Sequence, residues 1–227
     1  MGFLSCLVNN TKNTNLAEQD QNNQCRYGSA MKTIVVFLVL VAYTKAAVEE
    51  TPYEVIETAA DYEIRRYPQR KWVATTLEAL SYDSVTNALF QTLFQYIDGG
   101  NSEGAIIPMT APVTSLVAPG ASTESPSTFT MAFYIPEEFQ ASPPSPTNPN
   151  IFIEDRPEFE LYSRRFTGYA YEEEYTAEAN ALYLSLERDG ITDAQYAPWY
   201  IVGYNSPFDF VNRRNEVWYP RKAVKQY

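Results

Sequence analysis

The sequence contains no histidine, and its two cysteines, Cys6 and Cys25, both lie near the amino terminus. The rest of the chain therefore has no imidazole general base, no thiolate nucleophile and no zinc site of the Cys/His kind. A Ser-His-Asp or Cys-His catalytic arrangement is excluded, and no glycine-rich phosphate loop is present. Any chemistry must rest on carboxylates, tyrosines, arginines or the soft sulfur of methionine.

The chain is also poor in positive charge relative to negative charge. It has 17 lysine and arginine residues against 28 aspartate and glutamate residues, and its sequence pI is about 4.5. The basic residues do not cluster into a tract of the kind that phosphate binding requires, so we expect no nucleic-acid partner. With 227 residues, 45% of them hydrophobic, the chain can bury a sizeable core.

Long apolar runs are scarce, and the prominent one is Ile34–Tyr43. It follows Met31-Lys32 and precedes small residues, which is the layout of a secretory signal. A buried helix or strand is the alternative, and whether Met1 or Met31 starts the chain stays open. We therefore expect three parts, with no membrane span in the last: a disordered or misassigned extension over 1–30, a signal peptide over 31–46, and a single secreted domain over 47–227.

The first half of that domain predicts strands followed by a helix. Apolar and polar residues alternate over 53–67 and again over 71–79, as in half-buried strands. The apolar period then becomes helical over 82–97. Ser81 stands where a side chain can cap the helix, and Gly99-Gly100 can end it in the left-handed conformation.

The second half repeats this order after a proline-rich connector over 142–150. Residues 151–175 are typical of strands, residues 175–190 of a helix that ends at Gly190, and two short stretches near the carboxyl terminus of closing strands. The acidic run Glu172–Glu174 fits a solvated helix start that complements the dipole. The pattern predicts an α+β fold in which two helices cover one mixed or antiparallel sheet, which can close as a barrel.

The segment Ile106–Val117 is apolar enough to be buried but carries Pro108 and Pro112. Proline lacks a backbone donor and is kept out of sheet interiors. The two prolines have the same parity, so their missing donors fall on one side of the strand. The segment is therefore predicted to be an edge strand with one apolar face.

The basic residues come mostly in pairs, and one pair lies in the predicted strand YEIRRY. Tyr62, Ile64 and Arg66 share one face of that strand, whereas Arg65 points to the other. Arg66 is thus a candidate cation for an anionic ligand in an apolar cleft. An ordinary surface ion pair is the alternative reading of the same residue.

Five stretches, taken together, resemble the SOUL family of heme-binding proteins, with the heme-binding protein 2 branch the most similar. They occur in order from about Tyr53 to Lys222 and are YEIRRYPQRKWVATTLE, IPMTAPVTSLV, FTMAFYIP, IFIEDRPEFELYSRRFTG and GYNSPFDFVNRRNEVWYPRK. The resemblance implies a distorted β-barrel flanked by two long helices and built from two similar strand-helix-strand halves. It also implies a carrier, buffer or signalling protein that binds heme or another tetrapyrrole non-covalently, in a shallow apolar cleft beside the first helix.

The sequence departs from that branch at one position, because Arg66 stands where a histidine is the proposed axial ligand of iron. Imidazole ligation is therefore excluded, and only weak axial ligands are left: Met109 and Tyr62 first, then Met131 and Tyr67. Arg66 becomes a candidate partner for a propionate group. The candidate cleft residues are Tyr62, Ile64, Arg66, Phe90, Phe94 and Met109, and core packing is the alternative for the aromatic ones.

The predicted function is a secreted, non-enzymatic protein that binds a tetrapyrrole or a similar flat apolar anion. Two alternatives remain open. One is a small-molecule hydrolase-like enzyme on the same fold, in which a carboxylate with a raised pKa does acid/base work. The other is an extracellular interaction protein with a disused pocket. The sequence sets no oligomeric state.

Overall fold

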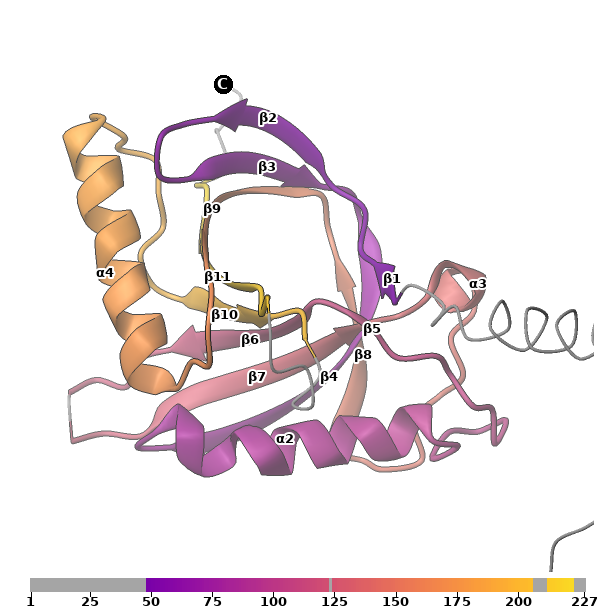
Figure 1. Cartoon of the computed structure of the whole chain (residues 1–227). Coiled ribbons are helices and arrows are strands. Elements are labelled where there is room, and N and C mark those ends of the chain that lie inside the picture. Colours follow the sequence, from indigo (N-terminus) through magenta and orange to yellow (C-terminus); the bar gives the residue numbers. More distant parts are fainter. Residues whose placement is uncertain (1–47, 123, 206–211, 223–227) are drawn as a thin grey trace, which may run out of the picture. The chain divides into compact units, whose positions relative to one another are not determined.

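The structure is a computed structural model that describes residues 48–122, 124–205 and 212–222, so the expected extension and signal peptide lie outside the described residues. The described part contains eleven strands and three helices (Figure 1). Their bounds are β1 Glu49–Glu50, β2 Glu54–Thr58, β3 Glu63–Tyr67, β4 Arg70–Ala79, α2 Tyr82–Ile97, β5 Thr110–Ala111, β6 Val113–Ala118, β7 Ser127–Tyr134, α3 Glu137–Gln140, β8 Ile151–Arg156, β9 Phe159–Phe166, α4 Glu172–Arg188, β10 Trp199–Gly203 and β11 Asn215–Pro220.

Nine strands form one sheet in the order β2-β3-β9-β11-β10-β6-β7-β4-β8. Every pairing in this sheet is antiparallel, and the sheet curls into a half-barrel (Figure 1). A separate two-stranded sheet pairs β1 with β5 in parallel. The expected α+β fold with a barrel-like sheet is confirmed.

Helices α2 and α4 lie against the outside of the curled sheet (Figure 1). Helix α2 packs on β4, β7 and β8, and helix α4 packs on β9 and β11. The helix expected over 82–97 is confirmed, and its apolar period gives a buried stripe in which Leu89 and Leu93 are fully buried. Burial of a leucine side chain contributes roughly 1.5–3 kcal/mol, so this stripe fixes the helix on the sheet. In the described residues, no helix is long and apolar enough to cross a membrane.

The two long helices begin beside each other, and each caps the other. Ser81 is the first residue outside α2, but its side chain does not cap its own helix. Instead, Glu172 at the start of α4 accepts hydrogen bonds from the Tyr82 amide at 2.9 Å and from the Ser81 hydroxyl at 2.6 Å. The Asp83 carboxylate accepts in return from the Glu172 amide at 3.1 Å. The carboxylates thus satisfy backbone donors at both helix starts.

Gly99, directly after α2, has φ +94° and ends the helix in the left-handed region as predicted. Gly190 does the same after α4 with φ +72°. Both positions favour glycine because a Cβ atom makes this backbone conformation costly.

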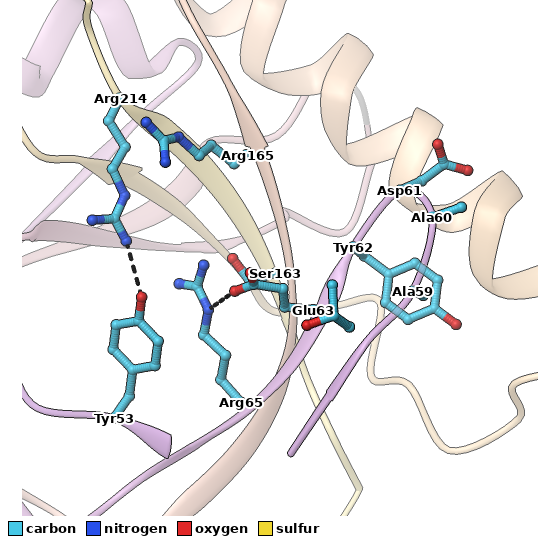
Figure 2. Close-up of a pocket in the computed structure, with 11 residues that line it drawn as sticks. Tyr53, Ala59, Ala60, Asp61, Tyr62, Glu63, Arg65, Ser163, Arg165 and Arg214 are labelled. Carbon is cyan, nitrogen blue, oxygen red and sulfur yellow. Dashed lines mark hydrogen bonds and ion pairs between the residues drawn. The ribbon is translucent and has the colours of Figure 1, made fainter. Parts of the chain in front are cut away.

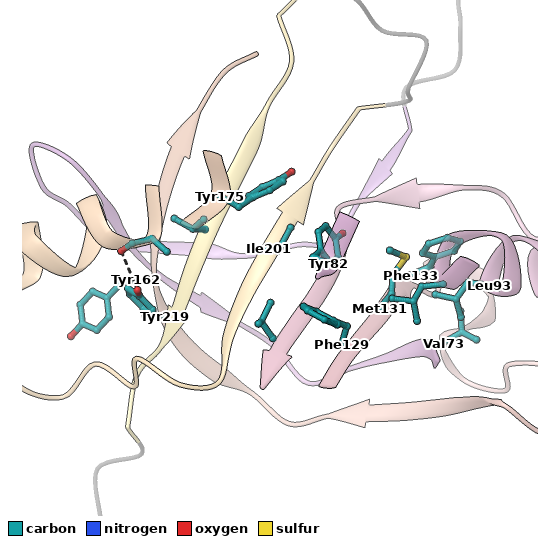
Figure 3. Packing of buried hydrophobic residues seen from close by; sticks show 14 of the residues in the cluster. Val73, Tyr82, Leu93, Phe129, Met131, Phe133, Tyr162, Tyr175, Ile201 and Tyr219 are labelled. Atoms are coloured by element: carbon teal, nitrogen blue, oxygen red, sulfur yellow. Dashed lines mark hydrogen bonds between the residues drawn. The ribbon is translucent and has the colours of Figure 1, made fainter. Parts of the chain in front are cut away.

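The main hydrophobic core fills the layer between the sheet and the two helices. Alternate residues of each strand point into it, among them Val73, Phe133 and Tyr162 (Figure 3). The residues between them, such as Trp72, Leu161 and Trp218, point to the inner face of the curl and form smaller clusters there. The inner face also buries charged side chains, and these define the site described below.

The prediction of an edge strand at Ile106–Val117 is wrong. The strand β6 begins only after Pro112, and it pairs on one side with β7 and on the other with β10. Pro112 lies between the short strand β5 and β6 and therefore removes no donor from the ladders of β6. The prolines mark a break in the segment, where the chain passes from the small sheet to the large one.

Candidate functional site

Strand β3 places two neighbouring arginines on opposite faces of the sheet. Arg65 points to the inner face, where it is buried, and its terminal nitrogens donate to the Glu216 carboxylate at 2.8 and 3.2 Å. Its Nε donates to Glu63 at 2.7 Å. Glu216 belongs to β11 and is completely buried. The inner face is thus built around an ion pair that joins strand β3 to strand β11.

Four further donors surround the Glu216 carboxylate. Arg214 donates through Nε at 2.9 Å, and the Trp218 indole donates at 2.7 Å. The hydroxyls of Ser163 and Tyr204 each donate at 3.1 Å. The guanidinium of Arg214 also lies 3.6 Å from the centre of the Tyr204 ring. A buried carboxylate is stable only when paired and hydrogen-bonded, and Glu216 meets both conditions.

The electrostatics of this cluster keep Glu216 ionised. Burial acts to raise the pKa of Glu216, but the guanidinium groups of Arg65 and Arg214 and the Trp218 hydrogen bond hold it below its ordinary value. Burial raises the pKa of Tyr67 and of Tyr204, which therefore stay protonated. Around Glu216 the inner face therefore offers hydrogen-bond donors and cations.

A pocket of about 310 Å³ opens beside this cluster, next to the turn between β2 and β3 (Figure 2). Its polar side is formed by Arg65, Arg165 and Arg214 together with Glu63 and Ser163. Its remaining walls come from Tyr53 and the turn, with Thr58, Ala59, Ala60, Asp61 and Tyr62. Figure 2 shows the Asp61 carboxylate directed away from the arginines. That carboxylate pairs with Arg188 of α4 at 2.8 Å.

The predicted residues of β3 and its turn lie on the outer face. Ile64 is buried in the main core, and Tyr62 is buried there while also lining the pocket. The Arg66 side chain is 40% exposed and pairs with Glu160 at 2.7 Å and Glu54 at 3.1 Å. Arg66 therefore sits in a surface ion-pair cluster, the alternative left open for it by the sequence.

The other predicted residues lie at helix α2, on a different part of the sheet. Phe90 and Phe94 stack with their ring centres 6.1 Å apart, and Phe90 also contacts Phe133 at 5.2 Å. Phe94 is 41% exposed, and Met109 is half-buried against the core. The structure therefore brings Phe90 and Phe94 together but separates them from Tyr62, Ile64 and Arg66, which belong to β3 and its turn.

Most of the weak axial ligands expected for a heme iron are buried in the structure. No group of three or more histidine, cysteine, aspartate or glutamate side chains able to hold a metal occurs in the described part of the chain. Burial raises the pKa of Tyr62, which disfavours a tyrosinate ligand, and Met131 is buried in the core. Of the weak axial candidates, Met109 is the one left half-exposed. The aromatic pair on α2 does fit the flat organic face of a macrocycle.

Sequence reasoning missed the inner cluster around Glu216. The strand pattern puts Arg65 on the face opposite Arg66, but it does not identify the partner of Arg65, which lies 151 residues away. One signal was present, because Glu216 is a lone carboxylate in the otherwise apolar strand EVWY. A charge at that position is almost never buried unless it is paired. Glu216 in an apolar strand and Arg65 in the predicted strand YEIRRY together indicate an internal ion pair.

The fold and the inner cluster define a small α+β half-barrel with two outer helices, and comparison with known proteins gives its family. A sequence profile described as SOUL heme-binding protein matches residues 48–220. The chain belongs to the SOUL heme-binding protein family. Heme-binding protein 2 of Homo sapiens is 42% identical over 162 residues, which cover 71% of this chain and 78% of that protein.

A second relative and one solved structure extend the comparison. Heme-binding protein 1 of Mus musculus is 32% identical over 176 residues, covering 76% of this chain and 92% of that protein. The crystal structure of the EcmrR C-terminal domain covers 76% of this chain and 99% of its own, with a TM-score of 0.55 at 12% identity. At that identity the likeness shows the fold alone.

Proposed function

We propose that this protein is a non-enzymatic binder of a tetrapyrrole, heme or porphyrin, or of a similar flat apolar anion. The observation that carries the proposal is the stacked pair of Phe90 and Phe94 at the edge of the buried face of α2, in a chain of this family. Relatives of this chain are named heme-binding proteins 1 and 2. Stacked rings that are partly open to solvent offer a flat apolar surface to a macrocycle.

We infer that apolar side chains of the segment after α2 extend this surface. Phe90 and Phe94 are four residues apart and follow one line on the helix, and Asp98 continues it. Asp98 forms a bridge with Ile106, whose side chain is 67% exposed. Met109 follows Ile106 by three residues and is half-buried. The proposed contact surface is Phe90, Phe94, Ile106 and Met109, which we call the α2 surface.

Binding at the α2 surface does not depend on iron, because no imidazole exists to coordinate it. The affinity comes from apolar contact with the ring faces. The test is a titration of the purified protein with hemin and with metal-free protoporphyrin, followed by absorbance and tryptophan fluorescence. We expect saturable binding of both with similar Kd. A hemin affinity far above that of protoporphyrin would contradict the histidine-free mode, and saturation by neither would contradict the proposal.

The hydrolase alternative requires a carboxylate whose pKa is raised. Glu216 is the buried carboxylate next to the pocket, but its pKa is lowered and its oxygens are occupied by six hydrogen bonds. It therefore does not meet the condition for a general acid or base near neutral pH. The interaction-protein alternative predicts no binding of either porphyrin, so the same titration decides it.

We also propose that the protein is secreted, with the signal peptide over residues 31–46. The support is the charged start, apolar core and small-residue end of that stretch. Expression of the full chain in secreting cells should release a protein whose amino-terminal sequence begins at Ala47. Retention inside the cell with residues 1–46 intact would contradict this.

A further inference from the structure

The pocket on the inner face holds more positive hydrogen-bond donors than its own acceptors can satisfy. Arg65 and Arg214 each use three of the five N–H donors of a guanidinium. Arg165, exposed at the pocket wall, makes no hydrogen bond or ion pair within the part of the chain that the structure describes. Two arginines therefore keep spare donors, and the third has all of its donors available.

The acceptors beneath the pocket are already saturated. Six hydrogen bonds reach the Glu216 carboxylate, whereas a carboxylate offers about four lone-pair sites. Tyr67, 2% exposed and in ring contact with Tyr53, has a hydroxyl with no partner among the described residues. Buried donors are normally paired, so the inner face is short of acceptors.

The charges that face the pocket do not cancel this excess. Glu63 lines the pocket and takes one donor of Arg65, and Glu50 takes one of Arg214 at 3.1 Å. The Asp61 carboxylate is turned away and held by Arg188 (Figure 2). Among the described residues, no carboxylate pairs with Arg165. Each carboxylate that lines the pocket is therefore paired with a cation, whereas Arg165 has no carboxylate partner in the described part of the chain.

We propose that this pocket is a binding site for a small oxyanion, a carboxylate or a phosphate group, held between Arg65, Arg165 and Arg214. Planar guanidinium forks match both groups in bidentate geometry. A volume of about 310 Å³ lies at the low end of ligand pockets, so the ligand is a small molecule. Its carbon body lies along Tyr53, Ala59 and Ala60, the less polar side of the pocket.

This site is distinct from the α2 surface in both position and chemistry. The pocket is formed by β3, β9 and the turn before β3, whereas α2 packs on β4, β7 and β8. Oxyanion binding therefore neither requires nor excludes porphyrin binding, and each can fail without the other.

The test is an NMR titration of the full chain with inorganic phosphate and, separately, with acetate, at constant ionic strength set by chloride. The Trp218 indole N–H donates to Glu216 and so reports on the cluster, and the Ser163 and Arg165 amides report on the pocket wall. We expect these signals to shift saturably, with the tighter anion identifying the ligand class. Absence of saturation with both anions would overturn the proposal.

Arg165→Gln and Arg164→Gln form a matched pair of variants. Both are neighbours in β9, but Arg164 points to the outer side, where it pairs with Glu178 of α4 at 2.7 Å. Loss of a charge-assisted hydrogen bond weakens binding by about tenfold or more, and we expect this for Arg165→Gln only. Arg165→Lys should recover part of the affinity. Equal affinity of Arg165→Gln and wild type, with unchanged unfolding midpoints, would overturn the assignment.

Discussion

Arg65 and Glu216 form a two-pronged ion pair, at 2.8 and 3.2 Å, across 151 residues of sequence. Strand β9 separates their strands, so the pair spans the inner face of the sheet. Glu216 is also the single carboxylate that Arg65 and Arg214 share. The stability of the inner face should therefore depend on this one carboxylate.

Glu216→Gln is expected to lower the free energy of unfolding by about 3 kcal/mol, because it leaves the buried Arg65 and the partly buried Arg214 beside a neutral amide. The control is Glu63→Gln, since Glu63 also pairs with Arg65 but is partly exposed. That change should cost less than about 1 kcal/mol. Urea unfolding at pH 7 measures both. Equal losses would show that burial of the pair is irrelevant.

The contribution of Glu216 should depend on pH in a defined direction. Its pKa in the folded protein lies below the ordinary value, since Arg65 and Arg214 outweigh the effect of burial. Its stabilisation is therefore complete above about pH 4.5 and is lost as pH falls through the folded pKa. The difference in unfolding free energy between wild type and Glu216→Gln should shrink from pH 6 to pH 3. A constant difference would contradict the lowered pKa.

Without histidine, few groups titrate near neutral pH, so the unfolding free energy should be flat between about pH 6 and pH 7.5. Arg66→His should introduce a slope. The imidazole would face Glu160 and Glu54, which raise its pKa in the folded protein. Its stabilisation is complete below about pH 6.5 and is lost as pH rises. Urea unfolding of the wild type and of Arg66→His across this pH range checks both expectations. An unfolding free energy of the variant that does not change with pH would mean that the imidazole forms no such pair.

Glu172→Ala should destabilise the protein by about 1–2 kcal/mol, the effect of losing a helix cap, because the start of α2 loses its acceptor. Glu173→Ala is the matched control: it removes a neighbouring exposed charge from the same turn of α4. Thermal unfolding followed by circular dichroism distinguishes them. If both variants lose the same stability, the acidic run acts only through the helix dipole.

Phe94→Ala should weaken protoporphyrin binding by roughly three- to tenfold, as expected for loss of one aromatic contact. Phe152→Ala is its control, since Phe152 is similarly exposed but lies in the edge strand β8. Arg66→Ala should leave the affinity unchanged, because Arg66 lies on β3, away from the α2 surface. Weakening by Arg66→Ala instead would return the site to the cleft expected from the sequence.

Local periodicity is enough to predict the two long helices and the faces of β3, but not the short helix α3. Leu89 and Leu93 are buried, and Arg65 and Arg66 point in opposite directions, because side-chain direction follows directly from helix or strand geometry. The family resemblance supplied the barrel. These features need only neighbouring residues or a known relative.

Features that depend on distant partners were not predictable. The cap of α2 comes from Glu172, ninety residues later, so Ser81 was assigned a role that another side chain fills. The central place of β6 depends on β10, far along the chain, and prolines alone suggested an edge. The ion pair of Arg65 depends on Glu216 in the same way. In each case the deciding partner lies in the other half of the chain, where local sequence patterns give no information about it.

The strand order has a consequence for how this chain can fold. Strands from before the proline-rich connector occupy β2-β3 and β6-β7-β4, and strands from after it fill the gap with β9-β11-β10 and add β8 at the edge. The two similar halves are therefore interleaved and are not separate folding units. A chain cut at the connector would leave open strand edges in both fragments, which favours aggregation. During synthesis, the first half cannot complete the large sheet until the second half has been made. Fragments cut at the connector and expressed together should assemble only with each other.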